Sequence, residues 1–233
     1  MATESLTLES GAAGLKALVE RALHLEATGS ARFSTLDPTP HGPALDVFVT
    51  TPFGCVASRR VEGHASRDGA VVSLQDLRDA LANVAAAREE SGASSMSGAS
   101  PVEVGPARDA NWLGALPPKS GFTERDIVPV NVVRDLADQG RRLARQFSGP
   151  MGPPRSLLEQ IVLTADTDET GGAPVDVPMR MIFTCTSLGL IPGASAPVEI
   201  PRHLRVSTAG RWIRLDAPFG SVYYTSGGIN LFG

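Results

Sequence analysis

The last thirty residues, His203 to Phe232, constrain the fold most, because they read as short strands separated by turns. Gly210, Gly220 and the pair Gly227-Gly228 mark the turns. Between the first two turns, from Trp212 to Asp216, polar or aromatic side chains alternate with aliphatic ones, as in a strand with one buried and one exposed face. This region is therefore predicted to be an antiparallel meander.

One turn of this region has a counterpart far upstream. The sequence Thr51-Pro52-Phe53-Gly54-Cys55-Val56 matches Ala217-Pro218-Phe219-Gly220-Ser221-Val222 at four of six positions. We expect each half of the chain to carry one strand-corner-strand unit, which suggests an internal repeat. In both corners, the glycine is expected to adopt a positive φ that a β-carbon would disfavour.

Several segments have the apolar spacing of helices. Residues 11–27 place Leu15, Leu18, Val19 and Ala22 on one face, and Ser10 is predicted to cap that helix. Ser73 opens a capping-box variant before a helix that reaches about Glu90. A third helix is predicted for residues 129–147. The segment 177–190 suits a buried helix or a buried strand, and we favour the helix.

The remaining patterns give the domain organisation. Residues 45–51 and 54–61 are rich in β-branched side chains and are predicted as strands. Residues 91–109 are small and polar, which predicts a flexible linker. The expected fold class is α+β, with two lobes that each contain helices and a small antiparallel sheet. The N-terminal lobe would span residues 1–90 and the C-terminal lobe residues 110–233.

Composition excludes several functional classes. The net charge of -4 argues against a general binder of polyanions. The first ten residues lack the basic and apolar regions of a signal peptide, and the longest apolar run, Val177 to Ile191, is too short to span a membrane. A cytoplasmic protein is expected. Cys55 and Cys185 lie in apolar runs and are predicted to be buried thiols.

No motif for metal, cofactor or nucleotide chemistry is complete. The four histidines have no pairing at metal-ligand or catalytic spacing. Asp166 to Gly171 matches the opening of a calcium loop, but Pro174 and Val177 occupy its ninth and twelfth positions. Neither a cofactor nor a metal is therefore expected.

The surface proposed for binding lies on the C-terminal meander. Trp212 and Arg214 share one face of their strand. We expect Tyr224 on the next strand, and Arg211 at the turn, to border the same surface. Aromatic residues and arginine are the usual anchors of protein interfaces. The leading hypothesis is a non-catalytic interaction or regulatory protein that binds a protein partner or a second copy of itself.

Two other classes stay open. Three helices followed by a basic hairpin is the element order of a winged helix, which would bind DNA through the helix at 177–190. That helix offers only Arg180 for reading bases, because its other side chains are those of a core. The second alternative is an enzyme whose site is assembled from scattered residues: Asp216, Arg214, His203 and Tyr224.

The second half also resembles a family of uncharacterised proteins from GC-rich actinobacteria. The resemblance rests on Asn111 to Pro118 (NWLGALPP), Val162-Leu163-Thr164, Pro178 to Ile182, and Gly210 to Tyr224 (GRWIRLDAPFGSVYY). It implies a shared fold and a cytoplasmic setting, and it assigns no activity.

Overall fold

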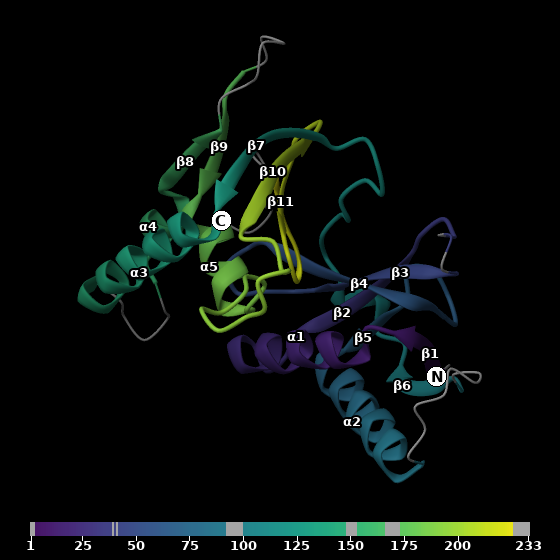
Figure 1. The fold of residues 1–233 in the computed structure, drawn as a ribbon. Coiled ribbons are helices and arrows are strands. Elements are labelled where there is room, and N and C mark those ends of the chain that lie inside the picture. Colours follow the sequence, from purple (N-terminus) through teal and green to yellow (C-terminus); the bar gives the residue numbers. More distant parts are fainter. Residues whose placement is uncertain are drawn as a thin grey trace. The chain divides into compact units, whose positions relative to one another are not determined.

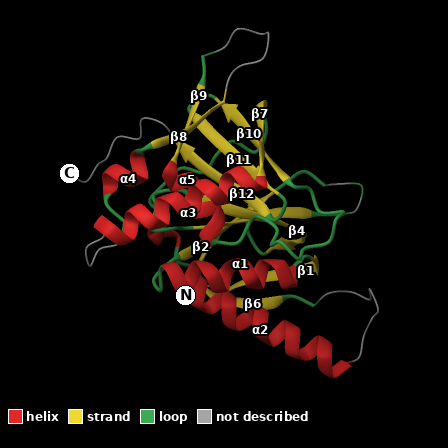
Figure 2. Cartoon of the chain, turned by 60° about the vertical axis from the view of Figure 1, so that its left-hand side comes forward, coloured by secondary structure: helices red, strands yellow, loops and turns green. Residues whose placement is uncertain are grey.

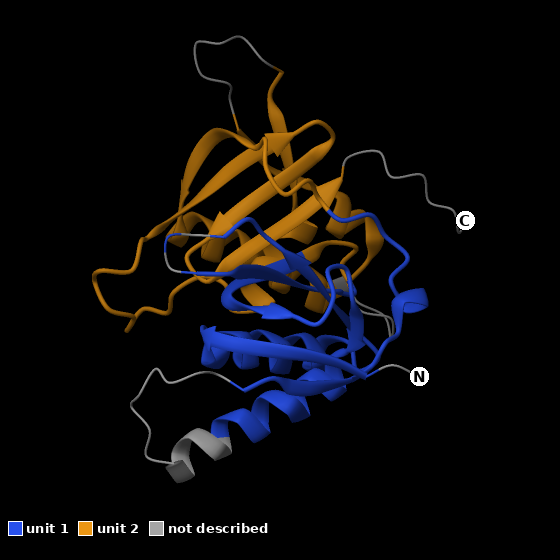
Figure 3. Ribbon diagram, turned by 90° about the vertical axis from the view of Figure 1, so that its right-hand side faces the viewer, with its two compact units in different colours: residues 1–52, 57–116 blue, residues 53–56, 117–233 orange. Residues whose placement is uncertain are grey.

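A computed structural model describes residues 3–38, 40, 42–91, 100–147, 153–165 and 173–225. The chain divides into two compact units (Figure 3). The N-terminal unit holds residues 1–52 and 57–116, and the C-terminal unit holds residues 53–56 and 117–233. Both units combine helices with antiparallel strands, so the predicted α+β class is confirmed.

Six antiparallel strands form the sheet of the N-terminal unit (Figure 1). They are β1 (Thr3–Ser10), β2 (Ser30–Thr35), β3 (Ala44–Val49), β4 (Val56–Ala65), β5 (Val71–Ser73) and β6 (Val102–Pro106). Each strand pairs with the next in the order β5-β2-β3-β4-β1-β6. The central strand β3 is buried along its whole length, which explains its almost unbroken apolar sequence.

Two helices lie side by side in this unit, α1 (Ala12–Leu25) and α2 (Leu74–Ser91) (Figures 1 and 2). Helix α1 buries Leu15, Leu18, Val19 and Ala22, the face that the spacing predicts. The capping box of α2 is confirmed, because the Asp76 N–H donates to Ser73 Oγ at 3.0 Å. Ser10 does not cap α1: it is the last residue of β1, and Gly11 occupies the cap position without a side-chain bond.

The strand β6 lies inside the segment predicted to be a flexible linker. Four of its five residues have partners on β1, and the fifth, Val104, lies at a register shift and is buried. The prediction does not hold for these residues, because a partner strand about 100 residues away supplies the hydrogen bonds that local sequence does not reveal. Residues 92–99 of the same segment lie outside the described residues, and the N-terminal unit continues to Leu116.

The C-terminal unit has a four-stranded antiparallel sheet in the order β12-β11-β10-β7. The strands are β7 (Thr123–Pro129), β10 (His203–Ala209), β11 (Trp212–Ala217) and β12 (Gly220–Thr225), so the predicted meander is confirmed for residues 203–225. Helices α3 (Val130–Phe147) and α5 (Met179–Ser187) pack on each other, and α5 packs on β12. A short helix α4 (Arg155–Glu159) and the hairpin of β8 (Ile161–Ala165) and β9 (Val175–Pro178) complete it.

Helix α5 explains the mixed signal of residues 177–190. The first residues of this segment extend β9, and the helix begins at Met179. Within the helix, Met179, Met181, Ile182, Phe183, Thr184 and Cys185 are buried. The favoured interpretation as a buried helix is confirmed for nine residues, and its strand-like opening belongs to β9.

Both Pro-Phe-Gly corners are turns between paired strands, and Gly54 (φ 72°) and Gly220 (φ 151°) have the expected positive φ. Phe53 to Val56 belong to the C-terminal unit: the Phe53 carbonyl accepts a hydrogen bond from Arg180 Nη1 at 3.1 Å, and its ring lies 6.1 Å from that of Phe183. The corners therefore do not fall one to each unit, and a duplication remains a prediction.

The two cysteines are buried free thiols, as predicted. Burial raises the pKa of Cys55 from 9.0 to about 12, against the opposing effects of a hydrogen bond with Thr184 and the charge of Arg180. Burial alone raises the pKa of Cys185 to about 12.

We expect these thiols to make stability depend on alkaline pH. Between about pH 9 and 12 the unfolded chain loses the thiol protons that the folded chain keeps, so the free energy of unfolding falls as pH rises. Each thiol contributes a slope of about 1.4 kcal/mol per pH unit. Urea titrations across this window measure the slope, and Cys185→Ala should reduce it. An unchanged slope in that variant would contradict the assignment.

Among the described residues, no helix is both long and apolar enough to cross a membrane.

Candidate interaction surface on the C-terminal sheet

The register of β10, β11 and β12 sorts their side chains onto two faces. Leu215 lies opposite Val206 on β10 and Val222 on β12, and all three are buried. Because successive side chains alternate, the neighbouring positions face the other way. We call this second face the outer face. It carries Arg205, Ser207, Trp212, Arg214, Asp216, Ser221 and Tyr223.

Arg214 is the centre of a fixed cluster on the outer face. Its Nε donates to Asp216 Oδ2 at 2.8 Å, and Ser221 Oγ donates to the other oxygen of Asp216 at 2.6 Å. The Arg214 guanidinium carbon lies 4.1 Å from the ring centroid of Phe122. Phe122 in turn meets Tyr223 edge-on, with 6.0 Å between ring centroids. Stacking and pairing together hold the guanidinium in one orientation.

Trp212 lies at the end of β11 beside small neighbours. Ala209 and Thr225 flank it on the adjoining strands, and its side chain is half-buried. Arg211, at the turn before it, is exposed. Tryptophan is among the side chains that most often anchor protein interfaces.

Arg205 and Ile127 extend the outer face towards β7. The two residues are directly opposed across β10 and β7, and Ile127 is 51% exposed. The side chain of Arg205 is 58% exposed, and its Nη1 lies 3.8 Å from Glu124 Oε2. An exposed ion pair at this distance contributes little to stability. Breaking the Arg205–Glu124 pair therefore costs little.

Tyr224 does not belong to this surface. It lies opposite Ile213, on the face that packs against α5, and the Arg180 guanidinium carbon is 5.2 Å from its ring centroid. The prediction that placed Tyr224 with Trp212 was wrong in orientation. Tyr223 occupies the expected position instead, and the alternation from buried Val222 could have shown this.

The scattered residues of the enzyme hypothesis do not converge on one site. Arg214 and Asp216 are together on the outer face, His203 is exposed at the start of β10, and Tyr224 lies on the opposite face. In the part of the chain that the structure describes, no three His, Cys, Asp or Glu residues are placed to hold a metal ion. The loop resembling a calcium site, residues 166–171, lies outside the described residues.

The winged-helix hypothesis is wrong about its recognition helix. Helix α5, the third in the expected order, is a core helix. Arg180, its only candidate for reading bases, has a side chain that is 13% exposed and is bonded to the Phe53 carbonyl. Residues 156–163, which would be the second helix of that order, divide between α4 and the strand β8, which begins at Ile161.

Comparisons with known proteins divide the chain where the structure does. Residues 1–114 match a family model described as a domain of unknown function (DUF8010). Residues 117–229 match a second such model (DUF8185). The gap between the matches coincides with the boundary at Leu116. A comparison with curated proteins found no match.

Solved structures show what fold this is. A DNA polymerase sliding clamp from Caulobacter crescentus matches with a TM-score of 0.54 and 12% identity, covering 98% of this chain and 67% of the clamp. The DNA polymerase III beta chain from Streptococcus pneumoniae matches with a TM-score of 0.51 and 10% identity, over 99% and 67% of the two chains. The chain thus matches two family models of unknown function, one in each unit, and its fold resembles that of the sliding clamps.

Proposed function

We propose that this protein is a non-catalytic interaction protein that binds a partner protein through the outer face of its C-terminal sheet. The observation that carries the proposal is half-buried Trp212 beside the fixed Arg214, whose guanidinium stacks on Phe122, with Phe122 packed edge-on against the buried Tyr223. Interfaces gain affinity from rigid aromatic and arginine side chains, because little side-chain entropy is lost on binding. Arg205 and Arg211 supply exposed charge at the rim.

The composition of this face favours a partner with carboxylates at matching positions. Arg214 is already paired with Asp216, but Arg205 faces only a distant glutamate and Arg211 is exposed. Charged rim residues steer a partner and fix its orientation more than they add affinity. Trp212 would provide the affinity and the two arginines the orientation.

Trp212→Ala should weaken partner binding about 30-fold or more while the fold persists. A half-buried ring at a sheet end contributes less to folding than a core tryptophan, whereas a central interface anchor contributes about 2 kcal/mol or more to binding. Tagged wild-type protein, Trp212→Ala and the control Val198→Ala, which changes a side chain that is 89% exposed, are compared by quantitative affinity purification from the host. A partner retained equally by all three would contradict the proposal.

DNA binding is a second candidate, favoured by the exposed side of α3 rather than by α5. Arg142 and Arg145 are exposed on the last turns of that helix, and neither has an ion-pair partner among the described residues. The similar solved structures are DNA polymerase sliding clamps, which makes a DNA contact worth testing. A purely structural explanation for these two arginines is that cations stabilise the carboxyl end of a helix.

Salt dependence separates these explanations. If α3 contacts phosphates, Arg142→Glu with Arg145→Glu should abolish duplex binding, and the wild-type affinity should fall steeply with salt concentration. Fluorescence anisotropy with labelled duplex DNA measures both. Binding that is absent in the wild type, or unchanged in the double variant, removes this candidate and leaves the protein-binding proposal intact.

A further inference from the structure

The strand β5 is an end strand of the N-terminal sheet, and β7 is an end strand of the C-terminal sheet. The outer edge of each determines whether another chain can add to the sheet there. Among the described residues, β5 pairs only with β2 in the N-terminal unit, and β7 pairs only with β10 in the C-terminal unit. An open edge presents backbone N–H and C=O groups that a second strand can bind. The question is whether these groups are available.

On β5, residues that follow β6 occupy the edge. The Val71 N–H donates to Asp109 Oδ1 at 3.0 Å, and the Val71 carbonyl accepts the Arg108 N–H at 2.8 Å. Both backbone groups of Val71, the first residue of β5, are therefore already bonded. An incoming strand would have to displace Asp109 to reach them.

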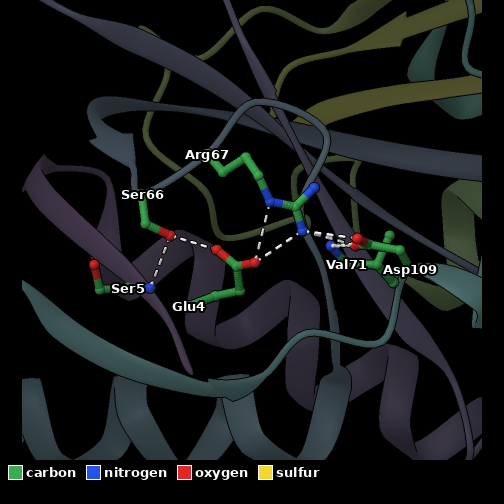
Figure 4. Close-up of polar contacts among 6 residues, drawn as sticks. All are labelled: Glu4, Ser5, Ser66, Arg67, Val71 and Asp109. Atoms are coloured by element: carbon green, nitrogen blue, oxygen red, sulfur yellow. Dashed lines mark hydrogen bonds and ion pairs between the residues drawn. The ribbon is translucent and has the colours of Figure 1, made fainter. Parts of the chain in front are cut away.

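Asp109 is itself held in place by a polar cluster (Figure 4). Arg67 Nη2 lies 2.8 Å from Asp109 Oδ2 and 2.8 Å from Glu4 Oε1, and Ser66 Oγ donates to Glu4 at 2.5 Å. Glu4 is buried. The hydrogen bond from Arg67, with smaller help from the Val71 N–H, lowers the pKa of Asp109, so this acceptor stays charged at neutral pH.

On β7, a different set of residues has the same effect. The Ile127 N–H donates to Asp126 Oδ1 at 2.7 Å, and Pro129 has no N–H to offer. The register shifts so that Arg125 has no opposite residue on β10, and its Nε donates to Thr208 Oγ1 at 2.8 Å. Bulges, prolines and charges are the features by which natural sheets prevent edge pairing.

We infer that the outer edges of β5 and β7 are closed to strand addition by Asp109 and Asp126, so that neither a second copy nor a partner strand joins the sheets there. At these two edges, a partner must then recognise side chains rather than backbone. This inference concerns backbone edges and stands independently of the proposed partner surface. It predicts that loss of either aspartate acceptor opens a latent strand-binding edge.

The test compares Asp126→Ala with Asp126→Asn, and Asp109→Ala with Asp109→Asn, in the full chain. Asparagine keeps an oxygen that accepts the backbone N–H but removes the charge, whereas alanine removes both. Sedimentation velocity over a wide concentration range should show the wild type and asparagine variants unchanged. The alanine variants should self-associate at least about tenfold more tightly. Hydrogen exchange should show faster exchange of the Ile127 amide in unassociated Asp126→Ala.

Circular dichroism establishes that each variant is folded. Asp109 and Asp126 lie in different units, so if the variants at one position do not fold, the variants at the other position still test the inference. The inference is overturned if the wild type self-associates and Ile127→Pro, which removes the amide in question, weakens that association. It is equally overturned if folded alanine variants sediment as the wild type does and their Val71 and Ile127 amides remain equally protected.

Discussion

Gly63→Ala is expected to lower the free energy of unfolding of the N-terminal unit by about 3 kcal/mol or more. Gly63 has a φ of 140°, a region that residues with a β-carbon rarely adopt. A β-carbon there would also lie 2.0 Å from the backbone oxygen of Thr7 on β1. Because that oxygen belongs to a paired strand, it cannot move away without disrupting the β1–β4 register.

Gly210→Ala is the matched control for this substitution. Gly210 also has a positive φ, 56°, but a β-carbon there would meet no atom within 4 Å. It should therefore lose only the conformational part, about 1 kcal/mol. Urea denaturation of both variants measures the difference. Equal losses would mean that β1 does not approach β4 as closely as described.

Gly140→Val should destabilise the C-terminal unit by about 2 kcal/mol. Gly140 lies where α3 crosses α5, and a β-carbon there would lie 2.8 Å from two ring atoms of Phe183 and 2.9 Å from the terminal carbon of Met179. Phe183 and Met179 are buried, so their ends have little room to move. Replacing a helical glycine normally gains a few tenths of a kcal/mol, so the crowding decides the sign.

Gln139→Val is the control, because it adds a β-branched side chain at the exposed neighbouring position of the same helix. Its cost should stay near 0.5 kcal/mol, as a rough expectation from helix propensity. Thermal unfolding followed by circular dichroism compares the two. A Gly140→Val protein as stable as Gln139→Val would contradict the close approach of α3 to α5.

The sequence predicts those elements whose signals are local. The helices α1, α2 and α3 follow from apolar spacing, and β11 follows from strict alternation. The sequence does not predict the strands β1 and β6, because each is defined by partners about 50 to 100 residues away. Pairing over such distances leaves little trace in a short segment, where Val102 and Val104 are too few to show a period.

The candidate surface shows the same difference between local signals, which the sequence reveals, and long-range contacts, which it does not. Trp212 and Arg214 were placed on one face by the period of two, and the structure agrees. Tyr224 was misplaced because the tight turn at Pro218 and Phe219 fixes the register of β12, so Tyr223 shares the face of Arg214. Phe122 could not be foreseen, since it precedes β7 and reaches Arg214 only through tertiary packing.

The outer face also differs from an enzyme active site. Its carboxylate, Asp216, is already bonded to Arg214 and Ser221, and Phe122 meets Tyr223 edge-on. Groups that already have hydrogen-bond or packing partners can complement the shape of another protein, but they are not positioned to react. This is why we assign the face to recognition.

Site-specific crosslinking in the host tests the proposed function most directly. A photoreactive amino acid replaces Ile127, which is 51% exposed beside Arg205 on the outer face, and Asn131, exposed on α3, is replaced in a control. The proposal predicts a discrete protein adduct from position 127 that is absent from position 131 and is lost when Arg211 and Arg205 are changed to glutamate. No adduct at position 127, or the same adducts from both positions, would contradict it.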